Sequence, residues 1–313
     1  MNCLERLSRW KTGEVISDAQ FDTISAIVRK DRFSVFFELN ALLYLGVVSL
    51  VGGIGWVVQE YAATFGDEAI LFVLTALLLG CFYYCFSRAL PYSYAFVESP
   101  NLALDYVLYL GCLTLGVELG YAEYRFHLMQ GNWDYYLLAS AGAFFVLAYR
   151  FDNRFVLSLA LSTLAAWFGL RISRFSFYTG ETLRRSGLMY GMLLIAAAIW
   201  FHRRNIKKHF TDTYFDIAGF VLFTSMISGV LQDESLIYLS GTIGLAAGAI
   251  AGGIRFNRFL FVVYGILFSY VAISYQFLHG VRLDSTAALL YLVLSGSLVV
   301  ILTIGLARRL GRG

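Results

Sequence analysis

The sequence predicts an all-α polytopic integral membrane protein, a bundle of about ten transmembrane helices. Apolar residues make up 59% of the 313 residues and charged residues only 14%, and the mean hydropathy is +0.68. Soluble domains carry about 25% charged residues, and a globule in water could not cover so much apolar surface. Many of the apolar runs also have the length of a membrane span. Lipid is therefore the expected solvent for most of the chain.

Residues 1–34 form a polar segment that we expect to be a cytosolic pair of amphipathic helices, over about 3–11 and 18–32. Ser17 followed by Gln20 fits a capping box at the start of the second helix. An apolar stripe follows it at helical spacing, made of Phe21, Ile24, Ile27 and Val28. Two explanations of the stripe stay open: packing on the first stretch or the membrane surface, or docking of a cytosolic protein partner.

Ten apolar segments follow, and roughly 20 residues are needed to cross the hydrocarbon. They cover approximately residues 35–58, 68–90, 102–121, 134–149, 155–172, 187–202, 213–231, 235–254, 258–279 and 286–307. The fourth and sixth segments are short, and the fourth and fifth could form one broken element. The predicted bundle thus covers residues 35–307, and a basic cytosolic tail of residues 308–313 follows it.

The distribution of Lys and Arg predicts the orientation, because cytoplasmic loops are enriched in basic residues. With the N-terminus inside, all but six of the 24 Lys and Arg residues lie on the cytoplasmic side. We therefore expect a bacterial inner membrane with both termini in the cytoplasm, and no nucleic-acid partner. The main exceptions fall in the external loop 171–187, which is either an interfacial piece or a sign of wrong segment bounds. They are Arg171, Arg174, Arg184 and Arg185.

Two short polar turns join apolar segments and carry arginines that mark the cytoplasmic face. We call them the first arginine hinge (residues 150–155) and the second arginine hinge (residues 255–259). Their arginines are Arg150, Arg154, Arg255 and Arg258. The similarity of the two arginine hinges predicts a parallel internal repeat over residues 68–172 and 187–279. The alternative is that the preference for basic cytoplasmic loops alone produced both turns.

A glycine ladder in the eighth segment predicts close helix packing. It consists of Gly241, Gly244, Gly248 and Gly252. Small residues four apart let a neighbouring backbone approach closely in a membrane. The pattern does not distinguish packing within the chain from formation of a homo-oligomer.

Polar and ionisable residues inside apolar segments are costly in lipid and are therefore candidate functional residues. The candidates are Glu118, Glu38, Asn40, Asp105 and Asp216. Glu118 lies toward the outer end of its segment and is the first choice for a polar path across the membrane. Arg125 lies two helical turns later, so a purely structural pair is the rival explanation. The other four lie near segment starts, where an acid is favoured by the helix dipole.

The motifs of soluble enzymes are missing from the sequence. It has no Walker-type phosphate loop, no G-x-S-x-G elbow and no H-E-x-x-H pattern. We expect no cofactor and no metal. The four cysteines, Cys3, Cys81, Cys85 and Cys112, are expected to be packing residues. An enzymatic activity is not predicted, although membrane enzymes can use ordinary polar residues.

The N-terminal stretch Trp10–Ser17, followed by the glycine-containing run from Leu42 to Val58, resembles the start of bacterial membrane proteins with a domain of unknown function. The resemblance implies a cytosolic helical pair followed by many spans, and no known activity. Two hypotheses stay open for the function. One is a transporter-like protein, or one that handles lipids or small molecules, with a polar path near Glu118. The other is a structural or sensory membrane protein whose N-terminal pair recruits a cytosolic partner.

Overall fold

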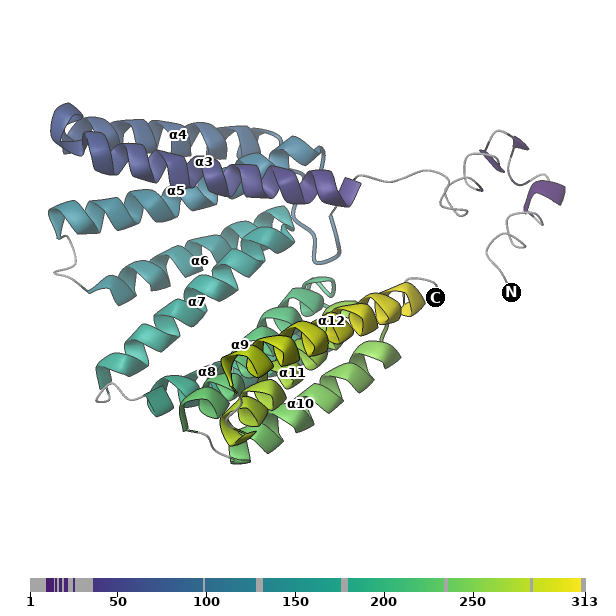
Figure 1. Cartoon of the computed structure of the whole chain (residues 1–313). Helices are drawn as coiled ribbons and strands as arrows, with labels where there is room; N and C mark the ends of the chain where they lie inside the picture. The colour runs from purple at the N-terminus through teal and green to yellow at the C-terminus, as the bar shows by residue number, and fades with distance from the viewer. Residues whose placement is uncertain are drawn as a thin grey trace. The chain divides into compact units, whose positions relative to one another are not determined.

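The computed structural model describes residues 10–13, 15, 17, 18, 20, 21, 25, 36–97, 99–127, 132–175, 180–233, 236–281 and 284–310 (Figure 1). Every regular element within these residues is a helix. The chain divides into two compact units, Met1–Trp56 and Val57–Gly313. The all-α class predicted from composition and periodicity is therefore confirmed.

In the first unit, the predicted capping box is present. The backbone amide of Ser17 donates to the Gln20 side chain at 2.9 Å, and the amide of Gln20 donates to the Ser17 hydroxyl at 3.3 Å. Lys11 forms an ion pair with Asp18 at 2.9 Å. The stripe residues Ile24, Ile27 and Val28 lie outside the described residues. This unit also holds the first part of helix α3 (Phe36–Phe65).

The second unit contains nine further helices, which are also drawn in Figure 1. They are α4 (Asp67–Ser87), α5 (Leu102–Phe126), α6 (Trp133–Phe151), α7 (Arg154–Phe175), α8 (Gly180–Arg203), α9 (Phe210–Asp233), α10 (Leu236–Arg255), α11 (Phe259–Val281) and α12 (Ser285–Leu310). With α3, they match the ten predicted segments one for one, and α6 and α7 are separate helices. Among the described residues, seven helices are long and apolar enough to span a membrane, and α3 contributes the shorter apolar stretch Leu42–Val57. The protein thus has several membrane-spanning helices, while the full number of ten stays a prediction.

The predicted external loop 171–187 was wrong in its bounds. Helix α7 continues to Phe175 and α8 begins at Gly180, so most of the exceptional arginines lie in helices. Three of these arginines, Arg171, Arg184 and Arg185, pair with side chains of the protein. The partners are Asp134 for Arg171 at 2.8 Å, Gln232 for Arg184 at 2.9 Å, and Glu181 for Arg185.

The nine helices of the second unit include two sets of four with the same pattern of contacts. In the first quartet (α4 to α7), α5 packs against α4, α6 and α7. In the second quartet (α8 to α11), α9 packs against α8, α10 and α11 in the same way. Helix α7 contacts both α8 and α9 and thereby joins the quartets, and α12 packs on α11. The apolar window of α12 has no buried residue within the chain, as expected of a helix that faces lipid.

The closest helix approaches use other glycines than the glycine ladder. A Cβ at Gly244, Gly248 or Gly252 would meet nothing within 4 Å, and one at Gly241 would lie 3.3 Å from the sulfur of Met226. A Cβ at Gly253 would instead lie 2.9 Å from the Arg258 carbonyl, and one at Gly191 would lie 2.6 Å from the side chain of Leu222. Packing within the chain therefore uses Gly191 and Gly253, and three of the four ladder positions are open. A contact of the ladder with another molecule stays a prediction.

Candidate functional site

The first arginine hinge ties three loops together through Asp152. This residue sits between α6 and α7 in a left-handed conformation at φ 61°, and its side chain is only 2% exposed. Its Oδ2 atom accepts a hydrogen bond from the Val97 amide at 2.7 Å and forms an ion pair with Lys207 Nζ at 2.7 Å. Its Oδ1 atom is paired with His209. The loop after α4 and the loop after α8 are thus both held by one carboxylate, and we call Asp152, Lys207 and His209 the hinge cluster.

The neighbouring Asn153 fixes the same turn from its other side. Its Oδ1 atom accepts hydrogen bonds from the amides of Phe155 and Val156 at 2.9 and 3.0 Å, which caps the start of α7. Its Nδ2 atom donates to Asp105 at 2.9 Å, and Ser99 donates to the same Asp105 oxygen at 2.7 Å. Asp105 is therefore a structural anchor between α5 and the hinge.

The electrostatics of the hinge cluster are those of a buried, compensated pair. The Lys207 side chain is 1% exposed, and its ammonium also donates to the carbonyl of Ala95 at 3.3 Å. A buried charge of this kind is tolerated because its partner and hydrogen bonds replace water. Burial lowers the pKa of His209, while the adjacent Asp152 carboxylate opposes that shift.

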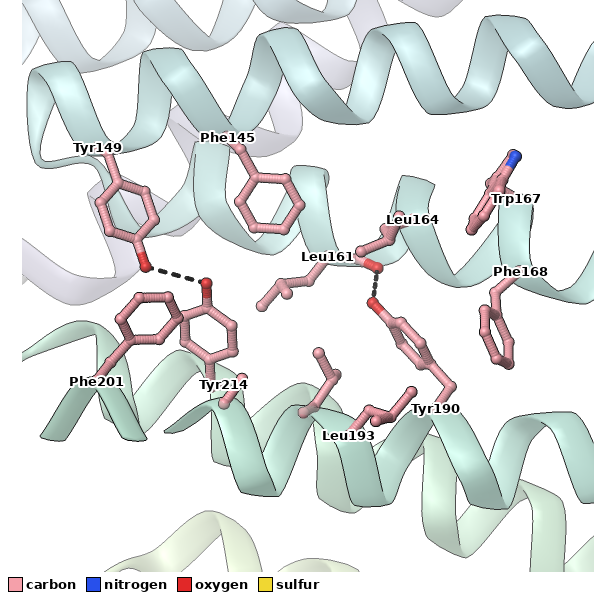
Figure 2. A pocket seen from close by; sticks show the side chains of 12 residues that line it. Phe145, Tyr149, Leu161, Leu164, Trp167, Phe168, Tyr190, Leu193, Phe201 and Tyr214 are labelled. Atoms are coloured by element: carbon pink, nitrogen blue, oxygen red, sulfur yellow. Dashed lines mark hydrogen bonds between the residues drawn. The ribbon is translucent and has the colours of Figure 1, made fainter. Parts of the chain in front are cut away.

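A cavity of about 480 Å³ lies between α6, α7, α8 and α9, and we call it the aromatic groove (Figure 2). Its lining is almost entirely apolar and rich in rings. The lining residues are Phe145, Tyr149, Leu161, Leu164, Trp167, Phe168, Tyr190, Leu193, Leu194, Ala197, Phe201 and Tyr214. Its size falls within the range of roughly 300–1,000 Å³ that is usual for ligand sites.

The polar side-chain atoms of the aromatic groove are the indole nitrogen of Trp167 and three tyrosine hydroxyls, and all three hydroxyls are bonded within the protein. The hydroxyls of Tyr149 and Tyr214 lie 3.0 Å apart, and the Tyr190 hydroxyl donates to the carbonyl of Leu161 at 2.7 Å, as Figure 2 shows. No Asp, Glu, Lys or Arg lines this cavity. The groove therefore offers a ligand van der Waals and ring contacts but no charge.

A chain of ring contacts connects the hinge cluster to the aromatic groove. The ring of Phe210 lies 4.5 Å from that of His209 and 5.1 Å from that of Tyr149. Tyr149 in turn meets Tyr214 through their hydroxyls. The cluster thus fixes the walls of the groove at the end where α6 and α9 meet.

A second cavity, of about 270 Å³, adjoins the aromatic groove and shares Phe168 and Tyr190 with it. We call it the polar chamber. Its lining differs in kind, because Arg184 and several hydroxyl residues border it. These are Ser186, Thr224, Ser225 and Ser228. The two cavities together change from apolar to polar along α8 toward its N-terminal end.

Glu118, the first choice for an intramembrane polar site, lies outside both cavities. Its Oε1 atom accepts a hydrogen bond from the Thr75 hydroxyl on α4 at 2.5 Å, and its Oε2 atom is buried without a hydrogen-bond partner among the described residues. Arg125 pairs with Asp67 instead of Glu118, so the rival explanation of a structural pair between Glu118 and Arg125 does not hold. A functional role for Glu118 stays a prediction.

The remaining polar candidates are dispersed. Asp105 of α5 accepts a hydrogen bond from the first arginine hinge, and Asp216 lies half-buried in α9. Helix α3 includes Glu38 and Asn40, whose side chains lie outside the described residues. Of the cysteines, Cys81, Cys85 and Cys112 are free and buried, and Cys3 lies outside the described residues. Among the residues that the structure describes, no three His, Cys, Asp or Glu side chains come close enough to hold a metal.

Sequence reasoning missed the aromatic groove because its residues look like ordinary core. Tyr149, Tyr190 and Tyr214 are single aromatic residues in apolar helices, and 17% of all residues are aromatic. Only Arg184 gave a signal, as one of the arginines that break the expected charge distribution. An arginine on the side predicted to be external was thus the sequence signal for the region around α8.

The fold defines a class: a membrane protein with several apolar helices that cross the bilayer. Within it, residues 8–157 match the family described as "Predicted membrane protein (DUF2157)". The resemblance of the N-terminal stretch to membrane proteins with a domain of unknown function is therefore confirmed, and it extends through α6 and the first arginine hinge. No curated protein and no solved structure matches the chain.

Proposed function

We propose that this protein handles lipids, and that its aromatic groove binds the hydrocarbon tail of a membrane amphiphile. The protein would act in a bacterial inner membrane, as a bundle of ten spans with both termini in the cytoplasm. The observation that carries the proposal is the chemistry of the groove, which has a ligand-sized volume, whose described lining residues carry no charged side chain and whose tyrosine hydroxyls are bonded within the protein.

The position of the groove favours a ligand that comes from the bilayer. Helices α7 and α9, which form two of its walls, are among those apolar enough to span the membrane. Leu193 lines the groove and is 53% exposed, and the neighbouring Met192 is 59% exposed. Since exposed apolar side chains of a membrane helix face lipid, a lipid tail reaches the groove without crossing water.

The alternatives have weaker support from the structure. Neither the aromatic groove nor the polar chamber includes Glu118, so neither cavity supports a polar transport path through this residue. The alternative role as a structural or sensory protein, with a cytosolic partner bound to residues 1–34, rests on the N-terminal pair alone. Lipid binding is the function that the geometry supports best.

Trp167 lines the groove and provides the test. A variant that keeps Trp167 and replaces the other four tryptophans by Phe is placed in nanodiscs that contain a small fraction of lipid with brominated tails. Bromine quenches tryptophan fluorescence on contact, so we expect saturable quenching of Trp167 at a low fraction of brominated lipid. Ala197→Phe, which fills the groove, should abolish the saturable part.

Two matched controls separate the groove from the general lipid surface. Ala196→Phe adds the same ring at an exposed position of α8 and should leave the quenching unchanged. A variant that keeps only Trp200, which is 52% exposed and does not line the groove, should show quenching in proportion to the brominated fraction. If Trp167 follows the same proportional curve and ignores Ala197→Phe, the proposal is refuted.

A further inference from the structure

We infer that the ligand of the aromatic groove carries an anionic headgroup, a phosphate or carboxylate, which Arg184 binds in the polar chamber. The inference rests on the proposed function and adds the chemical class of the ligand. It starts from the adjacency of the two cavities, which share the lining residues Phe168 and Tyr190. A single molecule that passes these two rings would occupy both cavities, with its tail in the aromatic groove and its head beside Arg184.

Arg184 is a built part of this chamber rather than a mobile surface charge. Its exposed fraction is 4%, its Nη1 atom donates to Gln232 at 2.9 Å, and its guanidinium lies 5.2 Å from the centre of the Tyr238 ring. A guanidinium presents five N–H donors in a planar fork that matches the oxygens of a carboxylate or phosphate. A positive group held in this way beside the aromatic groove selects an anion.

Two serines add hydroxyls to the same chamber. Ser225 and Ser228 lie one helical turn apart on α9, and both line the cavity with Arg184. Across from them, a Cβ at Gly187 would lie 2.1 Å from the Ser225 hydroxyl. Any larger residue at position 187 would displace Ser225, so the glycine keeps this hydroxyl in place. Hydroxyls beside a guanidinium are typical partners of phosphate and carboxylate oxygens.

The dimensions along α8 suit an amphiphile. Arg184 borders the polar chamber near one end of this helix and Phe201 borders the aromatic groove near the other. Seventeen residues at 1.5 Å each place them about 25 Å apart along the helix axis, against about 30 Å for the hydrocarbon core. The two cavities together thus follow most of α8, a length that accommodates a headgroup at Arg184 and an extended tail beside the helix.

The experiment compares two lipids with identical brominated tails, phosphatidic acid and phosphatidylcholine, by quenching of the Trp167-only protein in nanodiscs. We expect phosphatidic acid to bind roughly tenfold or more tightly, as charge-assisted hydrogen bonds are the strong ones. Arg184→Gln should remove this preference and leave binding of phosphatidylcholine unchanged. Arg185→Gln is the matched control, since the Arg185 side chain is 73% exposed, and it should keep the preference.

The outcomes separate the two proposals. Saturable binding of both lipids with equal affinity in the unmodified groove overturns the anionic headgroup and leaves tail binding intact. No saturable quenching with either lipid refutes the proposed function itself. If Arg184→Gln does not fold, Ser228→Ala serves instead, and it should lower the preference for phosphatidic acid severalfold; an unchanged preference would contradict the assignment of the polar chamber.

Discussion

The two arginine hinges have the same backbone and different surroundings. Asp152 in the first and Asn257 in the second are both left-handed, at φ 61° and 54°. In each, the amide of the next residue bonds to the carbonyl five residues earlier, at 3.1 and 2.7 Å, which is the Schellman closure of a helix. Both hinges also bond to the start of the second helix in their quartet, through Asn153 with Asp105 and through Arg258 with Asp212. These parallels support the predicted repeat.

The difference lies in what the hinges hold. Asp152 is buried and joins two further loops through Val97, Lys207 and His209, whereas Asn257 is exposed. The Arg258 and Asp212 side chains of the second hinge are 31% and 47% exposed. The same turn is therefore a simple connection in the second hinge. In the first hinge, one buried acid makes it a junction for the loops near the aromatic groove. Variants in each hinge test whether the two turns differ in this way.

The largest loss of stability is expected from Asp152→Ala. The change leaves Lys207 buried without its counter-charge, which costs about 3–5 kcal/mol. Thermal unfolding in detergent should show a large decrease in midpoint. Adding Lys207→Met to the same variant should restore part of the loss, because it removes the stranded charge. A double variant that is less stable than Asp152→Ala would contradict this account.

The next effect concerns the helix ends that precede the hinges. The first hinge has a buried alanine, Ala148, where the second has Gly253. Gly253→Ala would place a Cβ 2.9 Å from the Arg258 carbonyl and 3.0 Å from the Val262 amide, so we expect a loss of about 1–3 kcal/mol. Gly252→Ala, its neighbour in open space, should be neutral or stabilising. Equal melting of the two variants would show that α10 and α11 approach less closely than described.

Removal of the charge in the second hinge should matter little. Arg258→Gln loses a pair that is partly exposed on both sides, and such pairs contribute about 1 kcal/mol or less. The melting midpoint should shift by only a few degrees, far less than for Asp152→Ala. A loss as large as that of Asp152→Ala would mean that the second hinge is also a structural junction.

The smallest expected effect is a pH dependence confined to the first hinge. Burial lowers the pKa of His209 in the folded protein, so the unfolded chain binds this proton more readily. The contribution of His209 to stability is therefore complete above the ordinary histidine pKa of about 6.5. It is lost as the pH falls through the lowered pKa of the folded protein. His209→Gln should reduce the loss of stability between neutral and mildly acidic pH. An identical pH profile for the variant and the parent would contradict the burial of this imidazole.

The helices were predictable from sequence, and their tertiary partners were not. Apolar run length and turn residues placed all ten helices, and the Ser17–Gln20 capping box was predicted by its spacing. Such signals are local, so a single sequence contains them. The glycine ladder misled for the opposite reason, because small residues four apart permit close packing but do not specify which face has a neighbour. Gly191 and Gly253 lie close to neighbouring helices because of the tertiary arrangement, which the spacing of residues in one helix cannot show.

The candidate site was predicted only in part. Asp105 and the first arginine hinge were singled out from sequence, and the structure joins them through Asn153. Lys207 and His209 were not expected to meet Asp152, since more than fifty residues separate them. Aromatic residues of the groove carry no distinctive spacing, because a cavity arises where four helices fail to fill the space between them. The cavity results from how the four helices pack, so the sequence of any one helix contains no pattern that predicts it.

Native mass spectrometry of the protein released from detergent gives the most direct test of lipid binding in the aromatic groove. We expect the unmodified protein and Ala196→Phe to retain one lipid per chain after extensive detergent exchange, and Ala197→Phe to lose it. The mass of the retained molecule would identify its headgroup and tail. Retention of the same lipid by Ala197→Phe, or no retained lipid in any of the three proteins, would contradict the proposed function.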